Sequence, residues 1–304
     1  MIYTVTLNPS IDYIVQLETL ELGQLNRIAQ DYKFPGGKGI NVSRILQRLG
    51  KKNAALGFLG GFTGDFIRSS LEQEGILTDF TTISDDTRIN IKLKAQEETE
   101  VNGQGPTLSL AEIADLKSRL AAVSSQDIVI LSGSIPPSLP RDFYSQLIEL
   151  ITAKGAHFMI DTTGSSLLET LEAQPLLVKP NHHELAELFA TSFSSIEDIL
   201  PYGQLLLEKG AQHVIVSLGG DGALLFSGDA VYQAAPLKGT LINSVGAGDS
   251  MIAGFVSQLS ATPDLELAFR YGVACGSATA FSADLATAAA ITDLLDQITL
   301  KKLK

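Results

Sequence analysis

The sequence is poor in cysteine, tryptophan and positive charge. It has one cysteine, no tryptophan, and 22 basic against 34 acidic residues, which gives a formal net charge of −12 over 304 residues. Cys275 has no partner for an internal disulfide and lies in a run of small residues, which predicts a buried thiol in a reducing, cytoplasmic compartment. The acidic balance opposes attraction to phosphate backbones and anionic lipids, so we expect no nucleic acid and no membrane as partner.

Long apolar runs are also missing. None approaches the roughly 20 residues that a membrane-spanning helix needs, and the first seven residues contain no basic leader. We therefore expect a protein that is neither exported nor embedded in a membrane. The remaining composition, 45% hydrophobic and 18% charged, is ordinary for a folded chain with a large core.

Short apolar runs rich in β-branched residues alternate along the chain with stretches of helical periodicity. This alternation is typical of βαβ units, and the near-continuous hydrophobicity of the runs indicates a mainly parallel sheet covered on both faces. We predict an α/β fold with a three-layer α/β/α core, formed by one domain over residues 1–304. The predicted strands span residues 2–7, 54–58, 128–131, 158–160, 176–178 and 214–217.

Helix signals lie between these runs. Residues 42–49 have one apolar face, which predicts an amphipathic helix. Ser109 with Glu112, and Ser194 with Glu197, have the spacing of capping boxes at helix starts.

Two segments, residues 13–34 and 87–101, depart from this rhythm because their apolar and polar residues alternate. In the second segment one face has Arg88, Asn90, Lys92 and Lys94, and the other has Ile89, Ile91, Leu93 and Ala95. We interpret both segments as strands of a small separate sheet inserted discontinuously in the main domain. That sheet is either a lid with a polar inner face or a peripheral hairpin without a role.

The stretch Gly246-Ala247-Gly248-Asp249 leads directly into an apolar helical run. Small residues at a helix start leave backbone N–H groups free, and such amides bind phosphate or a developing oxyanion. Asp249 could serve as an N-cap. A carboxylate beside anion-binding amides is equally suited to act as general base for a hydroxyl that attacks a phosphoryl group.

Two further glycine clusters stand next to predicted strands or helices. Residues 217–222 follow an apolar strand, where an open α/β sheet places its ligand loops, although a plain glycine-rich turn explains them too. Residues 35–41 precede a helix and offer close backbone approach, one cation and one amide. Neither cluster is a Walker P-loop or a dinucleotide fingerprint.

A polar segment, Lys179-Pro180-Asn181-His182-His183-Glu184, follows the strand that ends at residue 178. It lacks the second histidine of a zinc-protease helix, and no cysteine cluster compensates, so zinc is not expected. Asn181 and Glu184 are hard oxygen ligands three residues apart and suit hydrated magnesium, or they mark an ordinary helix start.

Taken together, these stretches resemble the PfkB family of the ribokinase superfamily, and the resemblance covers nearly the whole chain in the right order. It implies a ribokinase-like fold with a small β-sheet lid that often serves as a dimer contact, and therefore a homodimer through the lid. His182 and His183 occupy variable positions and inherit no role. The matching segments are Asn8-Pro9-Ser10-Ile11-Asp12, Gly36-Gly37-Lys38-Gly39-Ile40-Asn41, Thr87-Arg88-Ile89-Asn90, Ser132-Gly133-Ser134-Ile135-Pro136, Lys179-Pro180-Asn181 with Glu184, and Gly246-Ala247-Gly248-Asp249.

Within this family, the likeness implies ATP-dependent phosphorylation of fructose 1-phosphate at its 6-hydroxyl, giving fructose 1,6-bisphosphate. Two alternatives stay open: a kinase for tagatose 6-phosphate, and a sugar-phosphate or nucleotide sensor without catalysis. ATP and Mg²⁺ are the expected small-molecule requirements.

The resemblance also implies roles for individual residues. Asp249 is the expected base, and the residues Gly246, Ala247 and Gly248 stabilise charge on the transferred phosphoryl group. Asp12, Gly37, Lys38, Asn41, Arg88 and Ser134 match the sugar-phosphate site. Lys179, Ser217, Leu218, Gly219, Gly220, Asp221, Gly222, Val273 and Ser277 match nucleotide contacts, and Asn181 and Glu184 match the motif that organises magnesium.

Overall fold

The computed structural model of the protein describes residues 1–162 and 164–304, and its centre is an eleven-stranded sheet. The strands are β1 (Ile2–Thr6), β4 (Asn53–Leu59), β5 (Leu77–Thr78), β6 (Thr81–Thr82), β9 (Ile128–Ser132), β10 (His157–Asp161), β11 (Leu177–Val178), β12 (His213–Ser217), β13 (Ala223–Ser227), β14 (Ala230–Ala234) and β15 (Leu300–Lys302). Their order is β15-β14-β13-β12-β11-β10-β9-β1-β4-β5, and β6 pairs with β4. The pairs from β12 through β1 to β5 and β6 are parallel, and β13, β14 and β15 extend one edge with antiparallel pairs.

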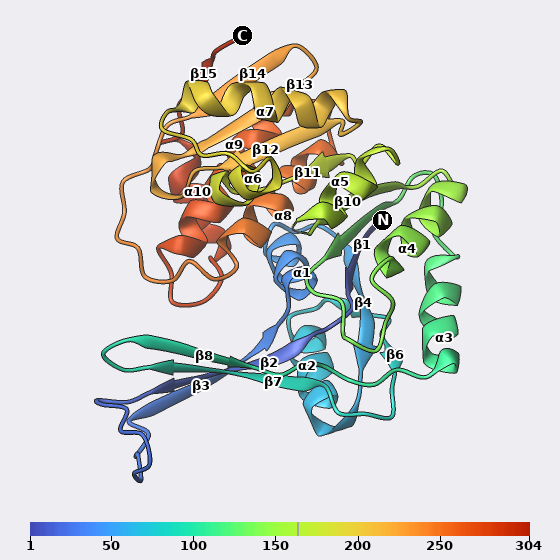
Figure 1. Cartoon of the computed structure of the whole chain (residues 1–304), viewed down its shortest axis with the longest axis vertical. Coiled ribbons are helices and arrows are strands. Elements are labelled where there is room, and N and C mark those ends of the chain that lie inside the picture. Colours follow the sequence, from blue (N-terminus) through green and yellow to red (C-terminus); the bar gives the residue numbers. More distant parts are fainter. Residues whose placement is uncertain (163) are drawn as a thin grey trace.

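Helices cover both faces of this sheet (Figure 1). They are α1 (Lys38–Arg48), α2 (Gly61–Gln73), α3 (Leu110–Leu120), α4 (Phe143–Ala153), α5 (Ser165–Leu171), α6 (His182–Leu188), α7 (Ile196–Glu208), α8 (Ala247–Leu259), α9 (Leu265–Ala280) and α10 (Ala288–Leu295). One apolar core packs α3 to α7 against the sheet, and a second packs α1, α8, α9 and α10 against the other face. The predicted three-layer α/β/α architecture with a mainly parallel sheet is confirmed.

A four-stranded sheet, called the lid here, projects from one end of the core (Figure 1). Its order is β3 (Gln30–Gly36), β2 (Ser10–Gln16), β7 (Arg88–Lys94) and β8 (Glu98–Asn102). The first pair of strands extends beyond the predicted segment 13–34, since β2 starts at Ser10 and β3 ends at Gly36, whereas β7 and β8 span residues 88–102 against the predicted 87–101. The lid strands therefore include residues of the matching segments at 8–12 and 36–41.

The two lid faces differ as the alternating pattern predicted. Arg88, Asn90 and Lys92 face a cavity, and Lys92 is only 7% exposed. On the opposite face Ile89 is 39% and Val101 is 55% exposed. On that apolar face Ile11 and Val15 are buried, so it meets solvent only in part, whereas the polar face lines the cavity.

One of the two predicted capping boxes is confirmed. The Ser109 hydroxyl accepts a hydrogen bond from the Glu112 amide, and the Glu112 carboxylate accepts one from the Ser109 amide. The prediction for Ser194 was wrong, because α7 is capped by Ser195 with Asp198. Two overlapping serine-acid pairs have the required spacing in the sequence, and the extended backbone at Ser195 selects the second pair. Within the described residues, no helix combines the length and apolar character needed to cross a membrane.

Candidate active site

A cavity of about 1030 Å³ lies along the carboxyl edge of the central sheet and extends to the polar face of the lid. Open α/β sheets bind ligands at this edge, and the volume is that of a site for small molecules. All of the predicted site residues line the cavity except Leu218 and Asp221. Leu218 is buried in the apolar core, and Asp221 is exposed on the far side of its turn.

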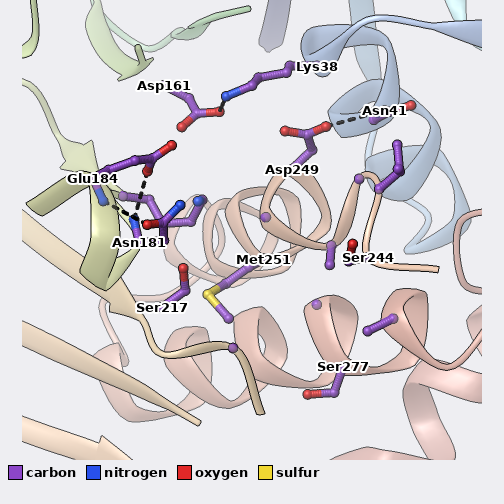
Figure 2. Close-up of a pocket in the computed structure, with 18 of the residues that line it drawn as sticks. Lys38, Asn41, Asp161, Asn181, Glu184, Ser217, Ser244, Asp249, Met251 and Ser277 are labelled. Carbon is purple, nitrogen blue, oxygen red and sulfur yellow. Dashed lines mark hydrogen bonds and ion pairs between the residues drawn. The ribbon is translucent and has the colours of Figure 1, made fainter. Parts of the chain in front are cut away.

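Asp249 stands at the centre of the cavity, inside the first turn of α8 (Figure 2). The helix is capped by Gly246, which has a left-handed φ of 77°, so Asp249 is not an N-cap. The Asp249 carboxylate is 6% exposed and accepts a hydrogen bond from the Asn41 side chain at 2.9 Å. A buried carboxylate held by an amide donor in this way is suited to accept a proton.

The start of α8 is open toward the cavity. Gly246 provides no side-chain cap, and the amides of Gly246, Gly248 and Asp249 have no acceptor among the described residues. The Ala247 amide instead reaches the Ser244 carbonyl at 3.3 Å. Lys179 lies beside this turn, because a Cβ atom on Gly248 would be 2.9 Å from its ammonium. The free amides, the helix dipole and this cation together form an anion site.

The sequence reasoning missed Asp161, which ends β10 and lines the same cavity. Its carboxylate accepts a hydrogen bond from the Lys38 ammonium at 2.8 Å, and Figure 2 shows this pair pointing into the space that Asp249 faces. A position at the carboxyl end of a parallel strand was the signal that could have identified Asp161. Its pairing with Lys38, 123 residues away, has no signal in the sequence.

These charges set the protonation of the site. Burial, followed by the negative charge of Asp161, raises the pKa of Asp249 to about 6, although Asn41, Lys38 and Lys179 act in the other direction. Burial alone would lower the pKa of Lys38, but Asp161, Asp249 and Glu184 outweigh it and raise that pKa. At neutral pH, Asp249 is thus a deprotonated carboxylate whose proton affinity is well above that of an ordinary aspartate.

The lid side of the cavity presents hydroxyl-binding and cationic groups. The Asp12 carboxylate accepts hydrogen bonds from the Ser10 hydroxyl at 2.8 Å and the Asn90 amide at 3.2 Å, which hold it in place. A Cβ atom on Gly36 would lie 2.5 Å from that carboxylate, so only glycine fits there. Ser134 accepts a 3.4 Å hydrogen bond from the Asn8 side chain at the adjacent wall.

Arg88 is partly committed to the backbone. Its guanidinium donates to the carbonyl of Asn8 at 3.0 and 3.2 Å and to the carbonyl of Gly103 at 2.8 Å. Because a guanidinium has five N–H donors, about two remain for a ligand. Arg88 thus ties the lid to the core and still presents a positive charge to the cavity.

Asn181 and Glu184 form the start of α6 in the structure. The Asn181 side chain accepts from the Glu184 amide, and the Glu184 carboxylate accepts from the Asn181 amide, both at 2.8 Å. This capping box uses Oε2 of Glu184, so Oε1 has no part in it. The described residues contain no cluster of three or more histidine, cysteine or acidic side chains able to hold a metal ion. The neighbouring imidazoles of His182 and His183 are in contact, with ring centroids 3.9 Å apart and a tilt of 39° between the rings.

The far end of the cavity is lined by small residues and by one face of α9. After β12, a short 3₁₀ turn (Gly219–Asp221) leads into β13, which is the glycine-rich turn that the sequence left open. Val273 and Ser277 line the cavity opposite this turn. This end of the cavity presents fewer polar side chains than the lid side, and it is suited to a flat, partly apolar group.

Comparison with known proteins gives a consistent result. Residues 5–291 match the profile described as pfkB family carbohydrate kinase. The chain is 52% identical to the 1-phosphofructokinase of Bacillus subtilis over all of both chains, and 36% identical to the D-tagatose-1-phosphate kinase of Bacillus licheniformis over 98% of each. The crystal structure of Escherichia coli phosphofructokinase-2 with fructose-6-phosphate superposes with a TM-score of 0.91 at 30% identity, covering 97% of this chain and 98% of that one.

Proposed function

The chain belongs to the pfkB family of carbohydrate kinases, and from this premise we propose that it transfers the γ-phosphoryl group of ATP to the 6-hydroxyl of fructose 1-phosphate. The 52% identity to a 1-phosphofructokinase over the full length supports this acceptor. The observation that carries the proposal is a buried carboxylate, Asp249, at the open N-terminus of α8 and opposite a cationic lid.

Each part of the site has a task in this reaction. Asp249 accepts the proton of the 6-hydroxyl while that oxygen attacks the γ-phosphorus. The free amides of Gly248 and of its neighbours stabilise the negative charge that is carried by the transferred group. Asp161 holds Lys38 beside Asp249, so that this cation faces the reacting end of the sugar. The acceptor's own phosphate lies toward the lid, near Arg88.

ATP is bound at the other end of the cavity in this proposal. Lys179 contacts its phosphates, and the turn at residues 217–222 together with α9 holds the nucleoside. Of that turn, Ser217 and the three glycines face the cavity, so Leu218 and Asp221 are not part of the binding surface.

The residues present fit a magnesium ion that arrives with ATP. Magnesium prefers oxygen ligands and is usually held by one or two carboxylates together with substrate phosphates. Oε1 of Glu184 is outside the capping box, and Glu184 lines the cavity together with Lys179 and Asn181. When bound, the ion neutralises phosphate charge, and Glu184 with Asn181 orients it directly or through its water ligands.

We further propose that the whole chain acts as one kinase domain and that the lid closes over the acceptor. The exposed apolar face of the lid, with Ile89 and Val101, supports a homodimer formed through that sheet. A cytoplasmic location follows from the substrates, because ATP and sugar phosphates are multiply charged and do not cross bilayers.

The test is a kinase assay with a panel of acceptors. We expect kcat/KM to be highest for fructose 1-phosphate, compared with tagatose 1-phosphate, tagatose 6-phosphate and fructose 6-phosphate, and the product to be a 1,6-bisphosphate by ³¹P NMR. A higher value for any other sugar reassigns the acceptor. Tight binding of acceptor and ATP without ADP release would instead identify a sensor.

A further inference from the structure

Lys92 is a buried cation that the roles above do not use. It lies in the middle of β7, faces the cavity and is 7% exposed. Its ammonium is 3.8 Å from the Asp12 carboxylate and 3.7 Å from the Glu100 carboxylate. Both distances are too long for hydrogen bonds, and within the described ranges 1–162 and 164–304 no acceptor bonds to this group. The ammonium nitrogen is not among the side-chain atoms buried without a partner, so its three N–H donors are open to the cavity.

The other cations of the cavity already have partners or another place. Lys38 is bonded to Asp161, Arg88 gives three hydrogen bonds to backbone carbonyls, and Lys179 lies beside α8. Lys92 is therefore the lid cation that faces the cavity with all three of its N–H donors unused. A phosphate oxygen at hydrogen-bond distance would provide the missing acceptors through charge-assisted hydrogen bonds.

We propose that Lys92 binds the phosphate that the acceptor sugar already carries, and so makes the kinase specific for a phosphorylated acceptor. This inference rests on the proposed function. Asp249 fixes the reacting hydroxyl at the core side, so the opposite end of the sugar points to the lid. Arg88, Asn90 and Lys92 alternate along one face of β7, which places two cations with an amide between them along that end.

The two carboxylates near Lys92 have different freedom to move. Asp12 is held by two hydrogen bonds and is suited to sugar hydroxyls. The Glu100 side chain is 43% exposed, makes no hydrogen bond to Lys92 and accepts one exposed 3.3 Å hydrogen bond from the Asn102 side chain, so it can turn toward solvent at little cost. Its negative charge next to an incoming phosphate is unfavourable. Glu100 therefore stays near Lys92 before substrate binds and gives way to the substrate phosphate.

The experiment uses the full-length enzyme and compares fructose 1-phosphate with fructose. In Lys92→Met, the ratio of kcat/KM for fructose 1-phosphate to that for fructose falls by roughly 10- to 100-fold, the value of a lost charge-assisted hydrogen bond. Lys92→Arg keeps most of the ratio. The matched control is Lys94→Met on the same strand and face, because Lys94 pairs with Glu98 at 4.0 Å and is outside the main cavity. Its ratio stays at the wild-type value.

Glu100→Gln is expected to strengthen binding of fructose 1-phosphate, whereas Lys92→Met weakens it. The Glu100 variant therefore remains informative if Lys92→Met does not fold. Our inference predicts a lower KM for fructose 1-phosphate in this variant, with KM for ATP unchanged. A purely structural ion pair predicts that Lys92→Met and Glu100→Gln weaken the enzyme in the same direction and with equal effect on both sugars, and that result overturns the inference. If another sugar phosphate is the true acceptor, the same ratio is measured with that sugar phosphate and its unphosphorylated form. If the protein binds but does not turn over, the ratio is taken from dissociation constants. A wrong substrate assignment is thus distinguished from a wrong role for Lys92.

Discussion

The helices α6 and α8 both begin at the cavity, but their N-termini are built in opposite ways. The first turn of α6 is closed by its own side chains, since Asn181 and Glu184 form a reciprocal capping box. The first turn of α8 has glycine at its N-cap and leaves its amides free. A closed turn contributes a fixed carboxylate to the site, whereas an open turn contributes backbone donors. In the proposed function, this difference separates a helix that orients the magnesium ion from a helix that binds phosphate charge.

The same contrast extends to the rest of the molecule. The helices α3, α7, α9 and α10 are capped by the side chains of Ser109, Ser195, Asp264 and Thr287. Like α8, α1 has a glycine N-cap without a side-chain hydrogen bond, and it also begins at the cavity with Lys38 and Asn41 in its first turn. The helices α2, α4 and α5 also lack a side-chain cap, but α1 and α8 are the uncapped helices that begin at the cavity.

The largest effect is expected at the open turn, from Asp249→Asn. The amide keeps the shape but cannot accept the hydroxyl proton, so kcat falls by roughly 10²–10⁴, the usual contribution of a general base, while ATP binding is kept. Steady-state kinetics and calorimetric titration with ATP measure the two quantities. Turnover near the wild-type rate would remove Asp249 from the chemistry.

The same variant should be more stable than the wild type at neutral pH. Because the fold raises the pKa of Asp249 from 3.8 to about 6, the ionised carboxylate costs stability above pH 6, on the order of 2–3 kcal/mol. As the pH falls through 6 toward 3.8, the wild-type carboxylate takes up a proton and this cost disappears. Urea unfolding at neutral and acidic pH should therefore show a stability gain in Asp249→Asn at neutral pH alone, and a gain independent of pH would contradict the assigned cause.

A smaller loss of kcat is expected when the backbone of the open turn is strained but the Asp249 carboxylate is kept. Gly246→Ala puts a side chain on a residue with φ of 77° and places Cβ 2.7 Å from Leu285, which should shift the amides and lower kcat on the order of tenfold. Gly228→Ala is the control, because Gly228 has φ of 55° in a remote turn with open space around it. Equal losses of kcat in both variants would mean that the effect is general destabilisation.

The smallest effect is expected at the closed turn of α6. Glu184→Gln keeps the capping box, since glutamine serves at this position, but removes the charge. It should leave stability unchanged and raise the magnesium concentration needed for half-maximal activity. Asn181→Ala should in addition lose about 1 kcal/mol of stability through the lost cap. An unchanged magnesium titration in Glu184→Gln would leave α6 with a structural role only.

Much of this contrast was visible in the sequence. The Gly246 to Asp249 stretch and the Asn181 to Glu184 spacing marked two helix starts, and the hydrophobic periods predicted the layers. The sequence could not show which glycine caps α8, because that depends on the left-handed backbone at Gly246. The prediction of Ser194 as a cap was wrong because Ser195 also has an acid three residues later, and only the backbone conformation distinguishes the two serines.

The electrostatics of the site depends on contacts between distant segments, and this part had no sequence signal. Lys38 meets Asp161 across 123 residues, and Asn41 meets Asp249 across 208 residues. The sequence could have predicted that a polar residue at the end of β10, such as Asp161, faces the ligand site. Its effect on the pKa of Asp249 could not be predicted, because that effect depends on how α1, β10 and α8 converge. Leu218 shows the reverse case, since it is the apolar member of a glycine-rich turn and packs into the core.

The most direct test of Asp249 as the base is the pH dependence of kcat/KM, which reports the pKa values of the free enzyme, measured with fructose 1-phosphate for the wild type and for Asp161→Asn. The wild-type rate should fall as the pH drops through about 6, because the base takes up its proton there. Asp161 contributes to that raised pKa, so removing its charge should move the acidic limb to lower pH, while ionisation of the sugar phosphate is the same in both enzymes. Identical acidic limbs in the two enzymes, or a limb that moves to higher pH, would contradict the account.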